Sequence, residues 1–299
     1  MFDKIKILLF SSLLVMSCTS QKSVKSQSIV SNSAEIQLVS DKFSFTEGPA
    51  ADSYGNVYFT DQPNDKIYFW NWKTNKVEEF LEKTGRANGT YFDEKDNLIT
   101  CSDESGEIWK INENGVAEIL TTNFEGKRLN GPNDLWLDNE GGIYFTDPLY
   151  VRDYWKNFKQ EIFDKNLYYR DSEGKITKLD TFTQPNGIVG SLKFKKLYVS
   201  DIDANKTFVY DILGEGKLGN KKLFCNLGSD GMTLDNIGNL YITGNGVTVF
   251  NSKGEQIHHI AVPEKWTANV TFGGENFSTL FITASKSVYT LKMNVSKVK

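Results

Sequence analysis

Six polar side chains recur along the 299-residue chain, each at the start of a similar stretch of about forty residues. A β-rich segment follows every one of them. A recurring structural unit places equivalent side chains at equivalent points in space, so six oxygen-bearing groups should converge. These residues, called the marked residues below, are Glu47, Asn88, Asn133, Asn186, Asp230 and Asn269.

The chemical types of the marked residues indicate what they could bind. Two carboxylates, Glu47 and Asp230, would repel each other when brought together without a counter-ion. A divalent cation resolves this conflict, and all-oxygen ligands favour Ca²⁺ first, with Mg²⁺, Mn²⁺ or, less naturally, Zn²⁺ behind it. The alternative is a hydrogen-bonded polar plug that fills the channel without a metal, and the pattern alone leaves both open.

The spacing of the marked residues predicts the fold. It ranges from 39 residues, between Asp230 and Asn269, to 53 residues, between Asn133 and Asn186. A period near forty residues with four short strands per unit is typical of a β-propeller blade. We therefore expect an all-β, six-bladed β-propeller with four-stranded blades around a central channel.

The order inside each unit places the marked residue. In the first unit, Glu47 opens a short strand, residues 52–56 form a turn, and the second strand, residues 57–61, ends in a hydroxyl and an acid. An isolated Asn88-Gly89 would indicate a turn. Each unit already has its hairpin turn several residues later, so the marked residue should open the innermost strand. The six side chains are then predicted to ring one mouth of the channel.

Two further segments complete the predicted architecture. Residues 36–39 can pair with residues 288–291 and close the ring, which removes the exposed sheet edge. The longest interval contains residues 150–159, which are more aromatic and charged than a blade requires. We interpret this segment as an inserted loop over one face, which either covers a binding site or is surface elaboration.

The first residues are typical of an exported lipoprotein. Lys4 and Lys6 precede an apolar run over residues 7–16, and a small residue and Cys18 follow it. We expect a signal peptide over residues 1–17, lipidation at Cys18, a flexible tether over 18–34 and the propeller over 35–299. The protein would then be anchored to a membrane, in the periplasm or at the cell surface. The alternative is an ordinary cleaved signal with a chance cysteine.

Composition excludes several classes of function. A net charge of −4, with acidic and basic residues interspersed, gives no basic stripe for nucleic acid.

The cysteines and histidines are not predicted to take part in chemistry. Cys101 and Cys225 sit in apolar runs, as small buried residues do. His258 and His259 are adjacent and far from any marked residue, and no Gly-x-Ser-x-Gly elbow is present. Nothing requires more than a monomer.

Five motifs, in order and correctly spaced, resemble the gluconolactonase family, which includes senescence marker protein. The resemblance runs from about residue 43 to residue 292, the whole expected propeller. It implies a six-bladed propeller with a channel-bound divalent metal, usually calcium, that hydrolyses sugar lactones or related cyclic esters. The motifs are Thr46-Glu47-Gly48-Pro49, Arg128 to Leu135, Tyr144 to Pro148, Gln184 to Ile188 and Ser229 to Met232.

By position in these motifs, the resemblance implies that Glu47, Asn186 and Asp230 are metal ligands and that Asn133 binds the metal or the substrate. A hard cation with open coordination positions would polarise the lactone carbonyl and acidify a bound water. Asp230 is the candidate general base. A carboxylate bound to a dication is a poor base, however. Asp230 would then position the water or attack directly.

Other residues are candidates for contact with the substrate. Asn88 and Asn269 would line the site within reach of a substrate hydroxyl. Asp201 ends a strand in the fourth blade, where it either faces the channel mouth or caps its own strand. Arg86 and Arg128 lie close to the ring in sequence, with a solvated surface role equally open to each.

Two other functions fit the same pattern. One is a non-catalytic propeller that binds a sugar or peptide, with a structural metal, because a fold does not certify an activity. The other is a phosphotriesterase-like hydrolase on the same scaffold. The absence of an evident channel histidine disfavours the second.

Overall fold

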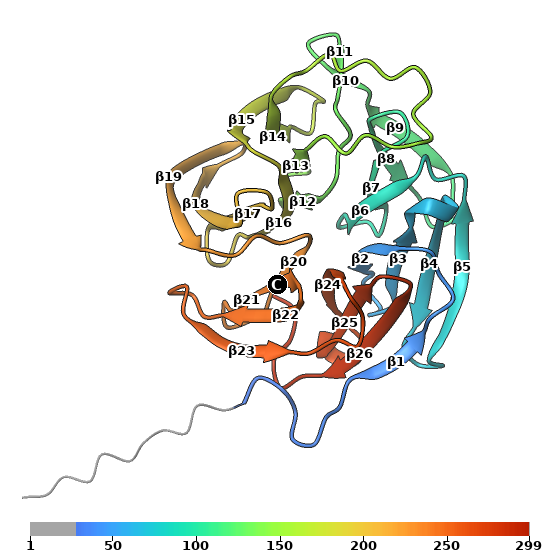
Figure 1. Cartoon of the computed structure of the whole chain (residues 1–299), viewed down its shortest axis with the longest axis vertical. Coiled ribbons are helices and arrows are strands. Elements are labelled where there is room, and N and C mark those ends of the chain that lie inside the picture. The colour runs from blue at the N-terminus through green and yellow to red at the C-terminus, as the bar shows by residue number, and fades with distance from the viewer. Residues whose placement is uncertain (1–27, 299) are drawn as a thin grey trace, which may run out of the picture.

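Each of the first five repeats forms one four-stranded antiparallel sheet, and the sixth repeat forms one with a strand from the start of the chain. The six sheets are arranged radially around a channel (Figure 1). This computed structural model describes residues 28–298. Strands follow chain order from the channel outward in the first five blades. The predicted all-β, six-bladed propeller is confirmed.

The strands of the blades have the following bounds. Blades one and two comprise β2 (Thr46–Ala51), β3 (Val57–Asp61), β4 (Lys66–Asn71), β5 (Lys76–Glu82), β6 (Ala87–Phe92), β7 (Leu98–Ser102), β8 (Glu107–Ile111) and β9 (Ala117–Thr121). Blades three and four comprise β12 (Leu135–Leu137), β13 (Ile143–Asp147), β14 (Lys165–Arg170), β15 (Ile176–Phe182), β16 (Pro185–Ser191), β17 (Lys196–Asp201), β18 (Lys206–Gly214) and β19 (Lys217–Cys225). Blades five and six comprise β20 (Met232–Leu234), β21 (Leu240–Gly244), β22 (Gly246–Phe250), β23 (Gln256–Ile260), β24 (Thr267–Gly273), β25 (Thr279–Ala284), β26 (Ser287–Lys292) and β1 (Gln37–Ser40). A small hairpin, β10 (Asn123–Phe124) and β11 (Lys127–Arg128), stands between blades two and three.

The first and last strands of the chain close the ring. β1 pairs antiparallel with β26, with Gln37 opposite Thr290 and Leu38 opposite Tyr289. The closing strand is one residue later than the predicted 36–39. Because β1 supplies the fourth strand of the last blade, the two ends of the chain are held in one sheet and the open edge of β26 is covered.

Apolar side chains between neighbouring blades hold the ring together. The second strands are buried almost throughout, as residues sandwiched between two sheets should be. Trp136 and Tyr144 of blade three pack with Ile188 and Leu197 of blade four, and equivalent clusters lie between the other blades. A fully buried large apolar side chain stabilises the fold by roughly 1.5–3 kcal/mol.

The hydroxyls near the ends of the second strands join each blade to the next. Thr60 Oγ1 donates to the carbonyl oxygen of Asn88 at 3.1 Å, and Thr146 Oγ1 to that of Asn186 at 2.7 Å. Both pairs lie in neighbouring blades. A buried hydroxyl therefore fixes the main chain that carries a marked residue, which explains why these strands end in a hydroxyl.

The acids that follow these hydroxyls have a different task. Each carboxylate accepts hydrogen bonds from main-chain N–H groups in the loop that leads into the innermost strand of its own blade. The pairs are Asp61 with Ser44 and Phe45, Asp147 with Asn130 and Gly131, and Asp201 with Thr183 and Gln184. The main chain around Asn186 is thus fixed from two blades, by Thr146 of blade three and Asp201 of blade four.

The packed part of the chain begins before residue 35, where the sequence places its start. Ile29 is buried in the cluster of the last blade, and Val30 bridges to Met293. The expected tether over 18–34 is therefore too long at its C-terminal end. The predicted signal peptide and lipidated Cys18 lie outside the described residues.

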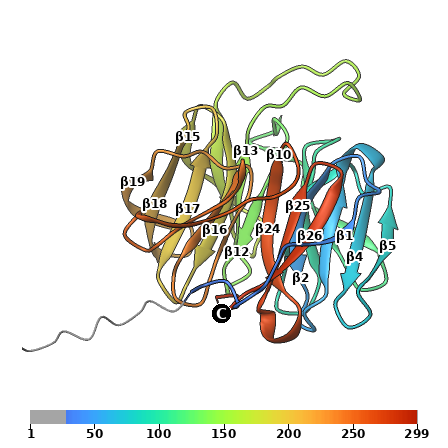
Figure 2. The same ribbon diagram turned by 60° about the horizontal axis from the view of Figure 1, so that its bottom comes forward.

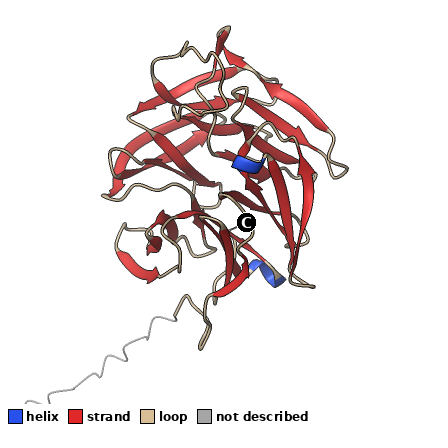
Figure 3. Ribbon diagram, turned by 45° about the vertical axis from the view of Figure 1, so that its right-hand side comes forward, coloured by secondary structure: helices blue, strands red, loops and turns tan. Residues whose placement is uncertain are grey.

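Helix is scarce in the described chain (Figure 3). Residues 28–298 contain two 3₁₀ turns, η1 (Gln62–Asn64) and η2 (Glu275–Phe277), and no other helix. No helix in that part has the length and apolar character to cross a membrane.

The expected insertion is a long loop between β13 and β14. It rises above the blades on the face opposite the C-terminus (Figure 2). The marked residues stand at the same end of the strands as this loop, because β13 ends there and the innermost strands begin there. We call this face the mouth face, and the opposite one, which carries the hairpin turns, the turn face.

Candidate functional site

The six marked residues stand at or just before the start of the innermost strands, on the mouth face of the ring. Four lie in β2, β6, β16 and β24, while Asn133 and Asp230 come two residues before β12 and β20. All except Asp230 are at most 6% exposed. A narrow cavity of about 40 Å³ runs between the innermost strands of all six blades, and Lys297 and Val298 lie at its turn-face end.

Glycines after marked residues let adjacent blades approach closely at the mouth. A Cβ added at Gly231 would lie 1.9 Å from Cγ of Asn269, and one at Gly48 would lie 2.0 Å from the carbonyl oxygen of Asn88. Gly48 also has a φ of +45°, which disfavours any side chain. The glycines of the Asn-Gly and Asp-Gly pairs therefore allow neighbouring innermost strands to pack closely.

Asp230 is held between two neighbouring blades. Its Oδ1 accepts a hydrogen bond from Asn186 Nδ2 at 2.8 Å, and its Oδ2 accepts one from Trp266 Nε1 at 2.6 Å. Burial raises the pKa of Asp230 to about 6, although these two bonds and the positive charge of Arg152 act to lower it. The carboxylate is thus fixed in orientation but costly to ionise.

Glu47 faces the same electrostatic problem. Burial raises its pKa well above the ordinary value, and the negative charges of Asp230 and Asp134 raise it further. The N–H of Gly48, 2.8 Å from Glu47 Oε2, and the Asn269 side chain oppose this shift. The predicted conflict between Glu47 and Asp230 is therefore present.

A third acid, Asp134, belongs to the same ring and was not among the predicted site residues. It is buried, and burial raises its pKa to about 7, against hydrogen bonds from the N–H groups of Leu135 and Ile188. The sequence carried a signal for it. Asp134 follows a marked residue at the place where the first, second, fourth and fifth units have glycine.

Three buried amide oxygens on the mouth face have no hydrogen-bond donor among the described residues: Oδ1 of Asn88, Oδ1 of Asn186 and Oε1 of Gln184. The orientation of the Asn186 amide is set because Nδ2 donates to Asp230 and to the Tyr150 hydroxyl, 3.0 Å away. A buried acceptor without a donor costs free energy unless a ligand satisfies it.

These oxygens fit a hard cation. The site combines carboxylates that are costly to ionise alone with free amide oxygens, and a divalent ion would relieve both. Within residues 28–298, no three His, Cys, Asp or Glu side chains are grouped so as to hold a metal by themselves. Amide oxygens are therefore needed to complete the donor set.

The inserted loop is attached across the mouth by a buried acid of blade two. Asp103 is 3% exposed, and its Oδ2 accepts hydrogen bonds from the Tyr154 hydroxyl and from Arg152 Nε, the latter at 3.3 Å. Trp155 Nε1 donates to the carbonyl oxygen of the same Asp103 at 3.1 Å. The attachment brings Tyr150 onto Asn186 and the charge of Arg152 within reach of Asp230.

The two arginines near the ring support this loop. The Arg86 guanidinium lies 4.5 Å from the Tyr154 ring, and that of Arg128 lies 4.9 Å from the rings of both Trp155 and Phe158. Such stacking stabilises an exposed contact by about 0.5–1 kcal/mol. Both arginines therefore contact the loop, a role that was not predicted for them.

The remaining candidates lie elsewhere. Both oxygens of Asp201 accept main-chain N–H groups, at 2.8 Å from Thr183 and 2.9 Å from Gln184, which are the contacts of the strand-cap alternative. His258 and His259 are exposed on the outer strand β23. Cys101 and Cys225 are buried free thiols.

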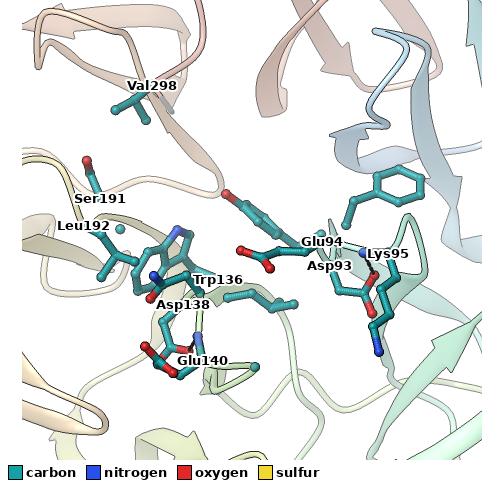
Figure 4. Close-up of a pocket in the computed structure, with 15 residues that line it drawn as sticks. Asp93, Glu94, Lys95, Trp136, Asp138, Glu140, Ser191, Leu192 and Val298 are labelled. Carbon is teal, nitrogen blue, oxygen red and sulfur yellow. Dashed lines mark hydrogen bonds between the residues drawn. The ribbon is translucent and has the colours of Figure 1, made fainter.

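A larger cavity of about 560 Å³ lies on the turn face (Figure 4). Two of its four acids, Asp93 and Asp138, are committed to turns. Oδ1 of Asp93 accepts the N–H of Lys95 at 2.8 Å, and Oδ1 of Asp138 accepts that of Glu140 at 3.0 Å. No marked residue lines this cavity. We therefore place the candidate site at the mouth face.

Fold and site together define a six-bladed β-propeller with an oxygen-lined polar site at one end of its channel. Residues 45–286 match the family described as the SMP-30/Gluconolactonase/LRE-like region. The chain belongs to this family, which confirms the resemblance seen in the sequence.

Similar proteins include hydrolases of two kinds. A gluconolactonase from Zymomonas mobilis is 28% identical over 294 residues, covering 87% of this chain and 82% of that protein. A solved gluconolactonase from Xanthomonas campestris superposes with a TM-score of 0.82 at 26% identity, covering 89% of this chain and 91% of the other. Diisopropyl-fluorophosphatase from Loligo vulgaris is 26% identical, covering 79% of this chain and 84% of that protein.

Proposed function

We propose that the protein is a divalent-metal-dependent hydrolase of sugar lactones. The observation that carries this proposal is the pair of free amide oxygens beside mutually repelling carboxylates at the channel mouth. Such a donor set suits a hard cation, and Ca²⁺ is the ion that all-oxygen ligands and the family resemblance favour. Membership of the family and the similarity to gluconolactonases support a lactone as the substrate.

The residues have distinct tasks in this proposal. Glu47, Asn133, Asn186 and Asp230 hold the metal. When bound, a divalent cation supplies Lewis acidity that polarises a carbonyl and acidifies water. Asp230 orients the attacking water, the role that stays open to a carboxylate that also binds the cation. The Trp266 and Asn186 hydrogen bonds fix the direction in which its oxygens point.

Substrate recognition falls to the groups around the metal. Asn88 in β6 and Asn269 in β24 lie on either side of β2, at the mouth-face ends of their strands. We propose that their amides offer donors and acceptors to a sugar hydroxyl. The inserted loop adds Tyr150 and Arg152 to this wall. Both oxygens of Asp201 accept main-chain N–H groups of the loop that carries Asn186 into β16, so we propose that Asp201 supports the substrate site indirectly.

A second candidate is hydrolysis of a phosphorus ester or fluoride, and the likeness to the Loligo vulgaris fluorophosphatase favours it. Neither histidine of this chain lies near the mouth, since both are on β23. The third candidate function is that of a non-catalytic binding propeller, which would bind a ligand without turning it over.

We also propose that the protein is an exported, monomeric lipoprotein attached to a membrane through Cys18. The described chain starts at Ser28, whose carbonyl oxygen accepts a hydrogen bond from Asn294 Nδ2 at 2.8 Å. The C-terminal segment to which it is attached lies on the face away from the inserted loop (Figure 2). An anchor on this side leaves the mouth turned away from the membrane. Cys18→Ser should move the protein, expressed in a bacterium, from the membrane to the soluble fraction; unchanged membrane attachment would contradict this.

The test of the function is a substrate panel on the purified propeller, residues 28–299. Aldonolactones, a simple aryl ester and diisopropyl fluorophosphate are each assayed with metal, after chelation, and after return of Ca²⁺. We expect lactone hydrolysis that disappears on chelation and returns with Ca²⁺. Preference for the fluorophosphate would support the second candidate, and metal binding without turnover of any substrate would support the third.

A further inference from the structure

One aromatic residue at the mouth belongs to no repeat and contacts the candidate catalytic acid. Trp266 lies in the connection between β23 and β24, directly before the innermost strand of blade six. The residue is 38% exposed, although large aromatic residues such as Tyr144, Tyr168 and Phe272 are fully buried in the blades. Its indole Nε1 donates to Asp230 Oδ2 at 2.6 Å.

This contact completes a hydrogen-bonded chain along the rim. Asn186 Nδ2 donates both to the Tyr150 hydroxyl and to Asp230 Oδ1, and Trp266 takes the second oxygen of Asp230. This series of hydrogen bonds joins the inserted loop to blades four, five and six. Removing the Trp266 donor would leave the Asp230 carboxylate held on one side only.

The direction of a ligating carboxylate is commonly set by such outer partners, and their loss costs roughly 10–100-fold in metal affinity or activity. We propose that Trp266 is a positioning residue that orients Asp230 toward the cation. It acts through Asp230, and no contact with the substrate is required. This inference rests on the proposed metal-dependent function of the same site.

An alternative role for Trp266 is packing alone. The nearest carbon of its ring lies 3.9 Å from a Cβ added at Gly244, so the ring lies over the end of β21 at ordinary contact distance. Phenylalanine keeps a ring there and removes only the N–H donor. Trp266→Phe therefore separates the two roles.

The chain offers a matched control. Trp72 also donates through its indole, to the carbonyl oxygen of Tyr54 at 2.9 Å, beside the outer strands of blade one. Trp72→Phe removes an equivalent hydrogen bond far from the mouth and should leave metal affinity and turnover unchanged.

The experiment is a calorimetric Ca²⁺ titration of the parent, Trp266→Phe and Trp72→Phe proteins, with lactone turnover measured at saturating Ca²⁺. We expect Ca²⁺ affinity to fall roughly 10–100-fold in Trp266→Phe alone. Turnover at saturating metal should fall through kcat, with KM little changed, and the metal-free variants should unfold at the parental temperature.

The outcomes separate this inference from the proposed function. Parental affinity and kcat in Trp266→Phe would overturn the positioning role while leaving lactone hydrolysis intact. A parent that binds Ca²⁺ without hydrolysing lactones would remove the function, yet weaker binding by Trp266→Phe would still support the positioning role. A parent that binds no divalent ion would overturn both.

Discussion

At the scale of single residues, the mouth combines acids and amides that satisfy one another incompletely. Asn186 uses both hydrogens of its amide and keeps Oδ1 free, and Oδ1 of Asn88 is free as well. The two amides are nevertheless assigned different tasks, metal binding for Asn186 and substrate contact for Asn88. Substitution can test this difference directly.

We predict that Asn186→Ala weakens Ca²⁺ binding by roughly 10–100-fold or more, since it removes a ligand and a hydrogen bond to Asp230. Asn88→Ala should instead raise KM for the lactone several-fold with little change in Ca²⁺ affinity. Calorimetry and steady-state kinetics on both variants decide the matter. Equal loss of metal affinity in the two would show that Asn88 is a ligand too.

The buried Asp147, which is not one of the proposed site residues, should make the free energy of unfolding depend on pH. Burial raises its pKa to about 7 from an ordinary value of 3.8, although N–H groups of Asn130 and Gly131 and the charge of Arg128 lower it. The folded state therefore holds this proton more tightly. The contribution of Asp147 to stability is greatest at low pH and is lost as pH rises from about 4 through 7.

Between pH 5 and pH 8 this group should lower the free energy of unfolding by about 2–3 kcal/mol. Asp147→Asn cannot ionise and should flatten the corresponding part of the pH profile. Urea unfolding of both proteins at several pH values measures the difference. If the unfolding free energy of the variant changes with pH as steeply as that of the parent, ionisation of Asp147 does not destabilise the fold, because its N–H donors offset the cost of the buried charge.

At the scale of elements, the inserted loop is the part that the blade repeat does not determine. Its attachment depends on Asp103, a single buried acid 49 to 52 residues away from its partners in sequence. We predict that Asp103→Ala frees the loop, so that a protease cuts between residues 150 and 159 faster and KM rises several-fold. The thermal stability of the propeller should change little.

Asp164→Asn is the control, because Asp164 is an exposed acid beside β14 with a surface partner, Lys178, at 3.4 Å. It should leave both proteolysis and KM unchanged. If Asp103→Ala alters neither quantity, the loop does not form part of the substrate site.

The repeat made the blades and the ring of marked residues predictable, because equivalent strands must occupy equivalent places. Asp134 is detectable in the repeat as an acid at a position that other units fill with glycine. Two features could not be found that way, because Trp266 lies in an irregular connection and Asp103 meets the loop only through tertiary folding. An acid at a strand end, such as Asp201, has two possible directions, and only the folded structure shows that it turns to its own loop.

At the scale of the whole molecule, stability depends on closure. β1 completes the last blade, and Ile29 extends the packed region further toward the N-terminus than the polar composition of the segment indicates. The sequence around Ile29 is rich in Ser, Gln and Lys, so its composition does not indicate that this residue is buried in the last blade.

A deletion series tests closure. Removal of residues 1–27 should leave the unfolding temperature unchanged, removal of 1–34 should lower it through the loss of Ile29, and removal of 1–40 should lower it most because β26 is exposed as an edge. Differential scanning calorimetry gives the order. Equal stability of the last two proteins would show that β1 pairing contributes little.

In the proposed function, the protein hydrolyses a lactone with a cation held by Glu47, Asn133, Asn186 and Asp230. The most direct test is kcat/KM for an aldonolactone in the parent and in Asp230→Asn, across a Ca²⁺ titration of chelated protein. Asp211→Asn, in the third strand of blade four and away from the mouth, is the control. We predict Ca²⁺-dependent activity in the parent and control, and a loss of about 100-fold or more in Asp230→Asn that saturating Ca²⁺ does not restore. Activity that survives both complete metal removal and Asp230→Asn would contradict the account.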